Sequence, residues 1–114
     1  MKEARSKSKN DLLPGTLEML ILKTLSIESM HGYGIAQHIE RTSADVIRVE
    51  KGSLYPALER LLRAGHVTAK WDISPTGRRA RYYTITASGR RCLGAEVSSF
   101  ESMVAAISRV LKTT

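Results

Sequence analysis

The chain has only one cysteine and no long apolar run. Cys92 has no second cysteine to pair with, which excludes an internal disulfide and a zinc site built from several cysteines. No apolar run approaches the roughly 18 residues that a membrane-spanning helix needs, and the polar N-terminus lacks the hydrophobic stretch of a secretory signal. We therefore expect a soluble protein in a reducing compartment, the cytoplasm.

The sequence also lacks the residue constellations that carry catalysis. Its three histidines are scattered, and no set of Asp, Glu or Cys residues accompanies them at metal-ligand spacing. There is no nucleophile with a base beside it, no phosphate-binding glycine loop and no pair of catalytic carboxylates. We expect no enzyme activity, no cofactor and no metal, with His31, His38 and His66 structural or exposed.

Acidic residues are missing from one long stretch of the chain. Between Ile73 and Ala95 there are five arginines and no Asp or Glu. Over the whole chain, 18 Lys and Arg exceed 11 Asp and Glu, which gives a formal net charge of +7. Positive charge gathered in one segment is typical of a polyanion binder. The 114 residues fit one domain with a modest core, which a partner subunit would stabilise.

Apolar periodicity predicts two helices in the first part of the chain. Residues 1–10 are basic and are expected to form a flexible arm, after which Pro14 and Thr16 can open a helix with a wide apolar stripe. A turn over residues 30–34 should break this helix, and Ile35 should begin a shorter one that ends near Thr42. Two helices joined by a glycine-containing turn form the scaffold of a helix-turn-helix. The β-branched residues Val46, Ile47 and Val49 are expected to be extended.

A third helix is predicted to begin at Gly52 or Ser53. Pro56 would then lie in its first turn, where a missing N–H has no consequence, and Gly65 would end it in the left-handed conformation. The apolar residues of this helix fall on one stripe, and the residues of its open face are Ser53, Tyr55, Glu59, Arg60 and Arg63.

Two alternating segments around residues 74–77 predict a β-hairpin with a basic tip. The tip carries Arg78, Arg79 and Arg81. Such a hairpin can grip phosphate while the third helix lies in a DNA major groove, which is the arrangement of a winged helix-turn-helix. Tyr82 and Tyr83 fall on opposite faces of the second strand, so one belongs to the core and the other can reach DNA; the alternation alone leaves open which is which.

A long final helix is expected from Thr86, as its cap, to about Lys112. Its apolar residues are spaced 4, 3, 4, 3 and 4 apart, which is the seam of a helix that packs on another helix. A second copy of the chain is the simplest partner, and packing within the chain is the alternative. The seam consists of Leu93, Val97, Phe100, Val104, Ile107 and Leu111.

The chain contains, in this order, the motifs Leu13-Pro14-Gly15-Thr16-Leu17, His31-Gly32-Tyr33-Gly34-Ile35, Gly52-Ser53-Leu54-Tyr55-Pro56-Ala57-Leu58, and Arg78-Arg79-Ala80-Arg81-Tyr82-Tyr83 followed by Thr86 and Gly89. Four motifs in this order resemble the PadR family of bacterial transcriptional regulators. The resemblance extends from Asp11 to Leu111 and implies the short type, a winged helix-turn-helix followed by one helix. It also implies operators with ATGT-like and ACAT-like halves. Phe100 stands where drug-sensing relatives often have tryptophan, and His66 where many relatives have an aromatic residue.

The predicted fold is therefore mainly α with a β-hairpin wing (α+β). Residues 1–10 form the arm, residues 11–86 the winged helix-turn-helix DNA-binding domain, and residues 87–114 the C-terminal dimerisation helix. The predicted function is that of a homodimeric, sequence-specific transcriptional regulator, a repressor relieved by a small planar aromatic or phenolic effector. The alternative is a winged-helix module that docks another regulator, which the cationic tip disfavours.

Three sets of site residues follow from this interpretation. The dimer interface is the seam of the final helix. The effector site combines that helix with the N-terminal segment, through Leu13 (or its neighbour Leu12), Val97, Phe100 and Met103. The predicted partner is a pseudo-palindromic DNA duplex, contacted by Tyr33, Lys51, Ser53, Tyr55, Pro56, Arg60, Arg78, Arg79 and Arg81.

Overall fold

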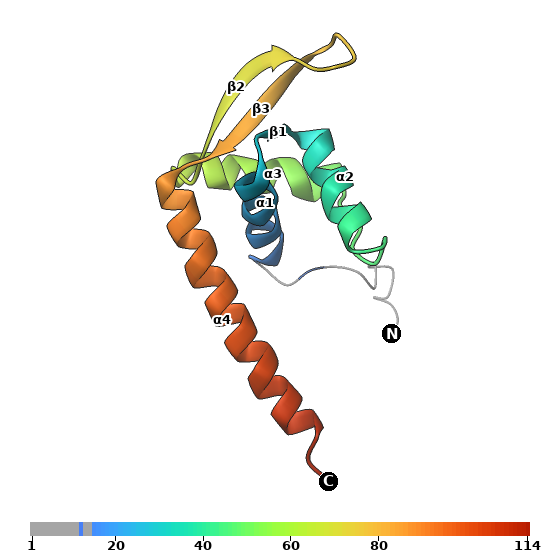
Figure 1. Cartoon of the computed structure of the whole chain (residues 1–114), viewed down its shortest axis with the longest axis vertical. Coiled ribbons are helices and arrows are strands. Elements are labelled where there is room, and N and C mark those ends of the chain that lie inside the picture. The colour runs from blue at the N-terminus through green and yellow to red at the C-terminus, as the bar shows by residue number, and fades with distance from the viewer. Residues whose placement is uncertain (1–11, 13–14) are drawn as a thin grey trace.

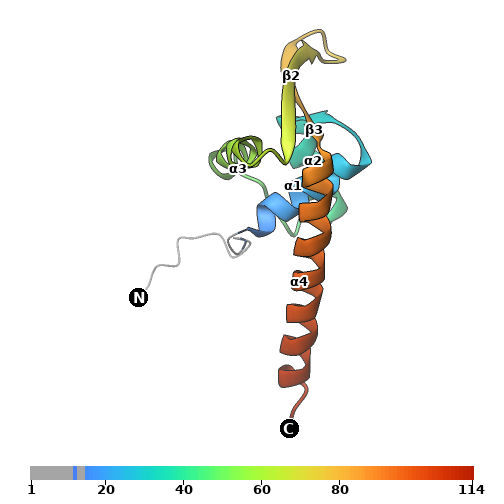
Figure 2. The ribbon, with the colours of Figure 1, turned by 90° about the vertical axis from the view of Figure 1, so that its left-hand side faces the viewer.

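The computed structural model describes residue 12 and residues 15–114, which fold as a winged helix with one long projecting helix (Figure 1). The predicted fold class is confirmed. The wing and the far end of the last helix extend in opposite directions from the body (Figure 2). The elements in order are α1 (Thr16–Ile27), β1 (Met30–His31), α2 (Gly32–Thr42), α3 (Lys51–Arg63), β2 (Val67–Ile73), β3 (Arg79–Ile85) and α4 (Ala87–Leu111).

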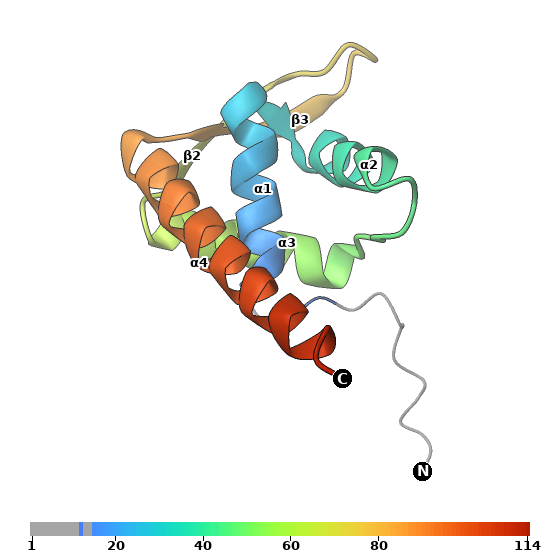
Figure 3. The ribbon, with the colours of Figure 1, turned by 60° about the horizontal axis from the view of Figure 1, so that its bottom comes forward.

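Helix α1 is the centre of the core. It lies between α2 and α4 (Figure 3), and its wide apolar stripe is buried on several sides, as the sequence predicts. Thr24 is buried with it and donates its hydroxyl hydrogen to the Leu20 carbonyl at 2.9 Å, so the polar group is satisfied. Each fully buried aliphatic side chain contributes roughly 1.5–3 kcal/mol. The buried cluster comprises Ile21, Leu22, Leu25, Ile35, Ile39, Leu54, Ala57, Leu58, Leu61, Val67, Tyr83 and Ile85.

The predicted turn over residues 30–34 is wrong in detail, because part of it is strand and part is helix. Met30 and His31 form β1, which pairs with β3. Helix α2 begins at Gly32 rather than Ile35, since the His31 ring nitrogen Nδ1 accepts a hydrogen bond from the Gly34 amide at 3.0 Å and caps the helix. The end of α2 at Thr42 agrees with the prediction.

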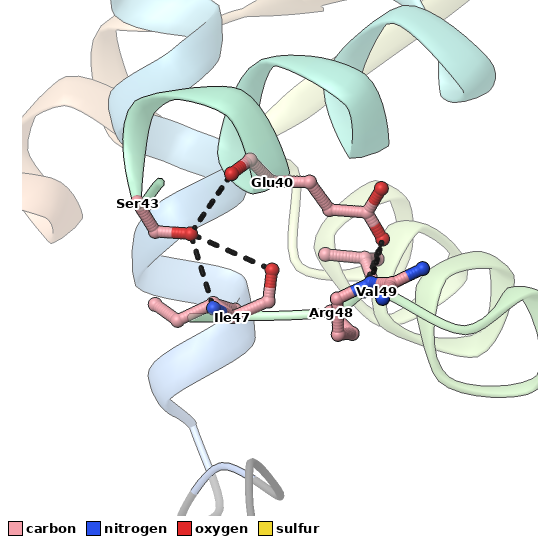
Figure 4. Close-up of polar contacts among 5 residues, drawn as sticks. All are labelled: Glu40, Ser43, Ile47, Arg48 and Val49. Atoms are coloured by element: carbon pink, nitrogen blue, oxygen red, sulfur yellow. Dashed lines mark hydrogen bonds and ion pairs between the residues drawn. The ribbon is translucent and has the colours of Figure 1, made fainter. Parts of the chain in front are cut away.

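The segment between α2 and α3 forms no strand; side-chain caps order it instead (Figure 4). Ala44 and Asp45 adopt left-handed conformations, with φ of 53° and 63°. The Ser43 hydroxyl accepts from the Ile47 amide at 3.1 Å, and the Glu40 carboxylate accepts from the Val49 amide at 2.8 Å. These bonds satisfy backbone groups that a sheet would otherwise pair.

Helix α3 begins at Lys51, one or two residues earlier than predicted. The Glu50 carbonyl already accepts from the Leu54 amide at 2.9 Å, which makes Lys51 the first helical residue. Pro56 therefore lies in the second turn, not the first, and the Gly52 carbonyl loses its helical donor. Gly65, with φ of 77°, ends the helix as predicted.

The sheet has the order β1-β3-β2 and is antiparallel throughout. Strands β2 and β3 form the predicted hairpin, called the wing below, whose tip turns at Gly77 with φ of 85°. The register answers the question left open by the alternation: Tyr83 is the core residue, at 3% exposure, and Tyr82 lies half-buried against the His31 ring.

Helix α4 has the predicted cap and length. The Thr86 hydroxyl accepts from the Gly89 amide at 3.0 Å and donates to the Gly65 carbonyl at 2.7 Å. Gly89 packs against the His66 carbonyl, and the first part of α4 contacts α1. The remainder projects from the body (Figure 2). Among the described residues, no helix combines the length and apolar character required to cross a bilayer.

Candidate nucleic-acid interface

Helices α2 and α3 and the wing border an open groove of ≈ 980 Å³. Four of the chain's aromatic residues line it, out of one Trp, four Tyr and one Phe in all. The wing lines the other side with three arginines. Aromatic faces and guanidinium groups gathered in one groove suit the sugars, bases and phosphates of a nucleic acid. The aromatic residues are Tyr33, Tyr55, Trp71 and Tyr83, and the arginines are Arg78, Arg79 and Arg81.

The N-terminal half of α3 presents four of the predicted DNA contacts to solvent. Lys51, Ser53, Tyr55 and Pro56 are all exposed. The ring of Tyr55 packs so closely on Gly32, the first residue of α2, that a Cβ there would lie 2.7 Å from the Tyr55 hydroxyl oxygen. Contact with α2 therefore fixes the direction of Tyr55, while 42% of the residue stays exposed.

Tyr33 borders the same groove from the first turn of α2. It is 64% exposed, and its hydroxyl oxygen accepts a hydrogen bond from the Gln37 side-chain amide at 3.1 Å. The structure thus brings Tyr33 and Tyr55 together on one side of the groove, facing the wing.

Two of the wing arginines are open to solvent. Arg78 and Arg79 are exposed, and among residues 15–114 neither has a carboxylate partner. The Arg79 guanidinium lies 4.7 Å from the centre of the Trp71 ring, a cation–π contact that limits its motion. Both cations are available to an anion at the wing.

The other two predicted arginines already have partners. Arg60 binds Glu18 of α1 at 2.7 Å, which raises the pKa of the guanidinium, and it lies beside a different pocket between α1, α3 and α4. Arg81 binds Glu59 of α3 at 3.3 Å. The sequence analysis placed Glu59 on the open face of the helix without assigning it a role.

Tyr83 closes the bottom of the groove beside this ion pair. The Arg81 guanidinium lies 5.8 Å from the centre of the Tyr83 ring. Burial raises the pKa of the Tyr83 phenol, which therefore stays neutral at physiological pH. The neutral Tyr83 ring forms the floor of the groove, and the positive charge of the groove comes from the wing arginines that line it.

The predicted effector and dimer residues lie on a separate surface. Leu13 falls outside the described residues, and Leu12 is half-buried. Val97 is half-buried, while Phe100 and Met103 are 46% and 60% exposed on α4. The pocket between α1, α3 and α4, of ≈ 240 Å³, contains Cys92 and Glu96 instead. Of the predicted seam, Leu93 is half-buried, and Val104, Ile107 and Leu111 are exposed.

Within residue 12 and residues 15–114, no three His, Cys, Asp or Glu side chains are grouped so that they could hold a metal ion.

Comparisons with known proteins show the family and the fold of this chain. A model of the family described as "Transcriptional regulator PadR-like family" matches residues 21–95, more than half of the chain. A PadR family transcriptional regulator from Eggerthella lenta is 28% identical, with a TM-score of 0.76 and coverage of 88% of this chain and 85% of that one. A PadR-like regulator from Bacillus cereus is 26% identical, with a TM-score of 0.75 and coverage of 88% and 95%. A transcriptional regulator from Clostridium thermocellum, 24% identical, shares the fold with a TM-score of 0.79 over 86% of this chain and 95% of that one.

Proposed function

Because the chain belongs to the PadR-like family of transcriptional regulators, and is thus a DNA-binding regulator, we propose that it acts as a homodimeric repressor released from its operator by a small aromatic effector. A dimer that covers an operator within a promoter blocks access to that promoter. Binding to chromosomal DNA requires a cytoplasmic location.

The observation that carries the DNA-binding mode is that Tyr55, on the exposed N-terminal half of α3, borders one groove with the solvent-exposed wing residues Arg78 and Arg79. In this mode α3 enters a major groove with Ser53, Tyr55 and Pro56 toward the base edges. Arg78 and Arg79 then meet the flanking phosphates.

The remaining predicted contacts have different positions in this mode. Tyr33 and Lys51 lie in the first turns of α2 and α3, and in this mode we assign them to the DNA backbone. Arg60 reaches DNA only if it leaves Glu18, and Arg81 only if it leaves Glu59.

Dimerisation is supported by the uncovered apolar face of α4. Phe100, Val104 and Ile107 are 46%, 44% and 49% exposed, although their spacing is that of a buried seam between helices. A second copy of α4 would cover them. The twofold symmetry of such a dimer presents the same surface to each half of a pseudo-palindromic operator.

The proposed effector site lies where the two α4 helices meet. Two copies of Phe100, with Val97 and Met103, would border an apolar slot, and a flat aromatic or phenolic compound would fit it by stacking. A compound that favours one arrangement of the two subunits changes the separation of the two α3 helices, and so changes operator affinity.

Selection of binding sites from random duplexes tests the DNA-binding mode. We expect pseudo-palindromic sites whose affinity falls steeply with salt. Arg78→Ala and Arg79→Ala should each weaken binding to all duplexes and reduce the salt slope by about 0.9, while Ser53→Ala and Tyr55→Ala should change the preferred sequence. A module that docks another protein would instead select no site and show no salt-dependent binding to duplex DNA.

A further inference from the structure

Glu59 places a negative charge on the face of α3 that would meet DNA. It lies one turn after Tyr55 on the same side of the helix, and both residues are exposed. A carboxylate in this position faces the phosphates of any duplex that α3 approaches, and like charges in proximity reduce affinity.

The carboxylate of Glu59 is directed at a specific cation. Its Oε2 atom accepts from Nη1 of Arg81 at 3.3 Å, which joins α3 to β3 across the base of the wing. The two side chains are 49% and 39% exposed, so water and DNA can reach both. The Glu59 carboxylate and a DNA phosphate can therefore compete for the Arg81 guanidinium in a similarly solvated environment.

The surroundings of Arg81 also direct it inward. Arg81 lies over the Tyr83 ring, and its strand neighbour across the hairpin is Trp71. Arg79, two residues nearer the tip, lies over Trp71 without a carboxylate partner among the described residues. Among the described residues, the two arginines thus differ in one respect that matters for phosphate: Arg81 is paired with a carboxylate and Arg79 is not.

We propose that Glu59 limits the overall DNA affinity of the protein, because it holds Arg81 away from phosphate and thereby weakens binding to every duplex, operator and unrelated sequence alike. This inference rests on the proposed DNA-binding function. Loss of one phosphate contact lowers affinity for every duplex equally, but the base contacts of α3 are made only on the operator. The restraint therefore leaves the affinity ratio between operator and unrelated duplexes unchanged and lowers absolute binding to both, so that only duplexes with base contacts are bound tightly.

The first test compares Glu59→Gln with Glu101→Gln, which removes the same charge from an exposed position on α4. Binding to a scrambled duplex and to the selected operator is measured over a range of salt concentrations. We expect Glu59→Gln to bind the scrambled duplex up to about fivefold more tightly than Glu101→Gln, the range of one exposed ion pair. Its salt slope should be steeper by about 0.9, one additional phosphate contact.

The second test places Arg81→Ala in both backgrounds. In the otherwise wild-type chain it should leave the salt slope unchanged, and in the Glu59→Gln chain it should remove the additional 0.9. Equal behaviour of Glu59→Gln and Glu101→Gln, or a shallower slope for Arg81→Ala alone, overturns the inference while DNA binding stands. If the wild-type chain binds no duplex at low salt, the proposed function and the inference are both wrong.

Discussion

The contact between Gly32 and Tyr55 shows how one missing side chain shapes the groove. Gly32 is buried at the start of α2, and the Tyr55 ring occupies the space that a larger residue there would need. Tyr55 and Tyr33 of α2 line the same groove. The direction of a predicted base-reading side chain is thus set by a neighbouring helix.

Replacing Gly32 with alanine should disturb the direction of Tyr55. The new methyl group would overlap the Tyr55 ring, so the ring must move, and we expect reduced discrimination between operator and scrambled duplex. Gly52→Ala is the matched control, because nothing lies within 4 Å of a Cβ at that position on α3. Competition binding with the two duplexes measures the effect. Equal discrimination by the two variants would show that Tyr55 needs no support from α2.

At the residue scale, sequence patterns place side chains on faces but do not pair them. The exposed face of α3 and the basic wing were predictable, because both follow from alternation and helical spacing. The core position of Tyr83 and the Glu59–Arg81 and Glu18–Arg60 pairs were not, since each depends on how elements distant in sequence meet. The sequence did contain one indication that Glu59 belongs to the site, because it lies four residues after Tyr55 and therefore on the same face of α3.

At the scale of elements, α4 is attached to the body through a tight contact at its first turn. Gly89 lies against the His66 carbonyl, and Thr86 bonds to both the Gly89 amide and the Gly65 carbonyl. His66 follows directly after the glycine that ends α3. The start of α4 and the end of α3 are therefore joined by the short Thr86 side chain and by the Thr86 amide, which donates to the His66 carbonyl at 3.1 Å.

Gly89→Ala should destabilise the fold, because its Cβ would overlap a backbone carbonyl that cannot move alone. We expect a loss of roughly 1–3 kcal/mol in the free energy of unfolding. Gly94→Ala, on the same helix with open space around its Cβ, should instead gain roughly 0.5–1 kcal/mol. Urea-induced unfolding at one fixed protein concentration compares them. A Gly89→Ala chain as stable as Gly94→Ala would mean that the contact is loose.

The elements themselves were predictable where their signal is local. Helices α1 and α4 and the hairpin follow from apolar spacing and from cap and turn residues. Strand β1 has two residues and exists only because β3 lies beside it, and α2 begins early because the His31 ring caps it. The position of Pro56 was predicted wrongly because Glu50, not a preferred cap residue, provides the first helical carbonyl.

For the whole molecule, the exposed seam on α4 predicts the assembly. Val104→Glu would place a charge among apolar side chains of the proposed dimer and should dissociate it. Ser102→Glu is the control, because Ser102 lies on the opposite face of α4. Sedimentation velocity at tens of micromolar protein distinguishes dimer from monomer. A monomeric wild-type chain under these conditions would contradict the proposed assembly.

The proposed effector site also belongs to the assembled molecule. Planar aromatic and phenolic compounds should bind the wild-type protein and lower its operator affinity, and Phe100→Ala should weaken that binding by loss of the stacking surface. Calorimetric titration of a compound panel measures both. Binding that Phe100→Ala leaves unchanged would locate the site elsewhere, and a panel in which nothing binds would argue against an aromatic effector.

Thr86 and Gly89 attach the first turn of α4 closely to the end of α3, so α4 and the winged helix are expected to move as one rigid unit. A helix of 25 residues is ~37 Å long, so a tilt of ~5° about its far end displaces its base by ~3 Å. Since that base is joined directly to α3 and the wing, the displacement passes to the DNA-reading surface instead of being absorbed at a hinge. In the proposed dimer, a small change in the angle between the two subunits would therefore displace the two α3 helices relative to successive major grooves.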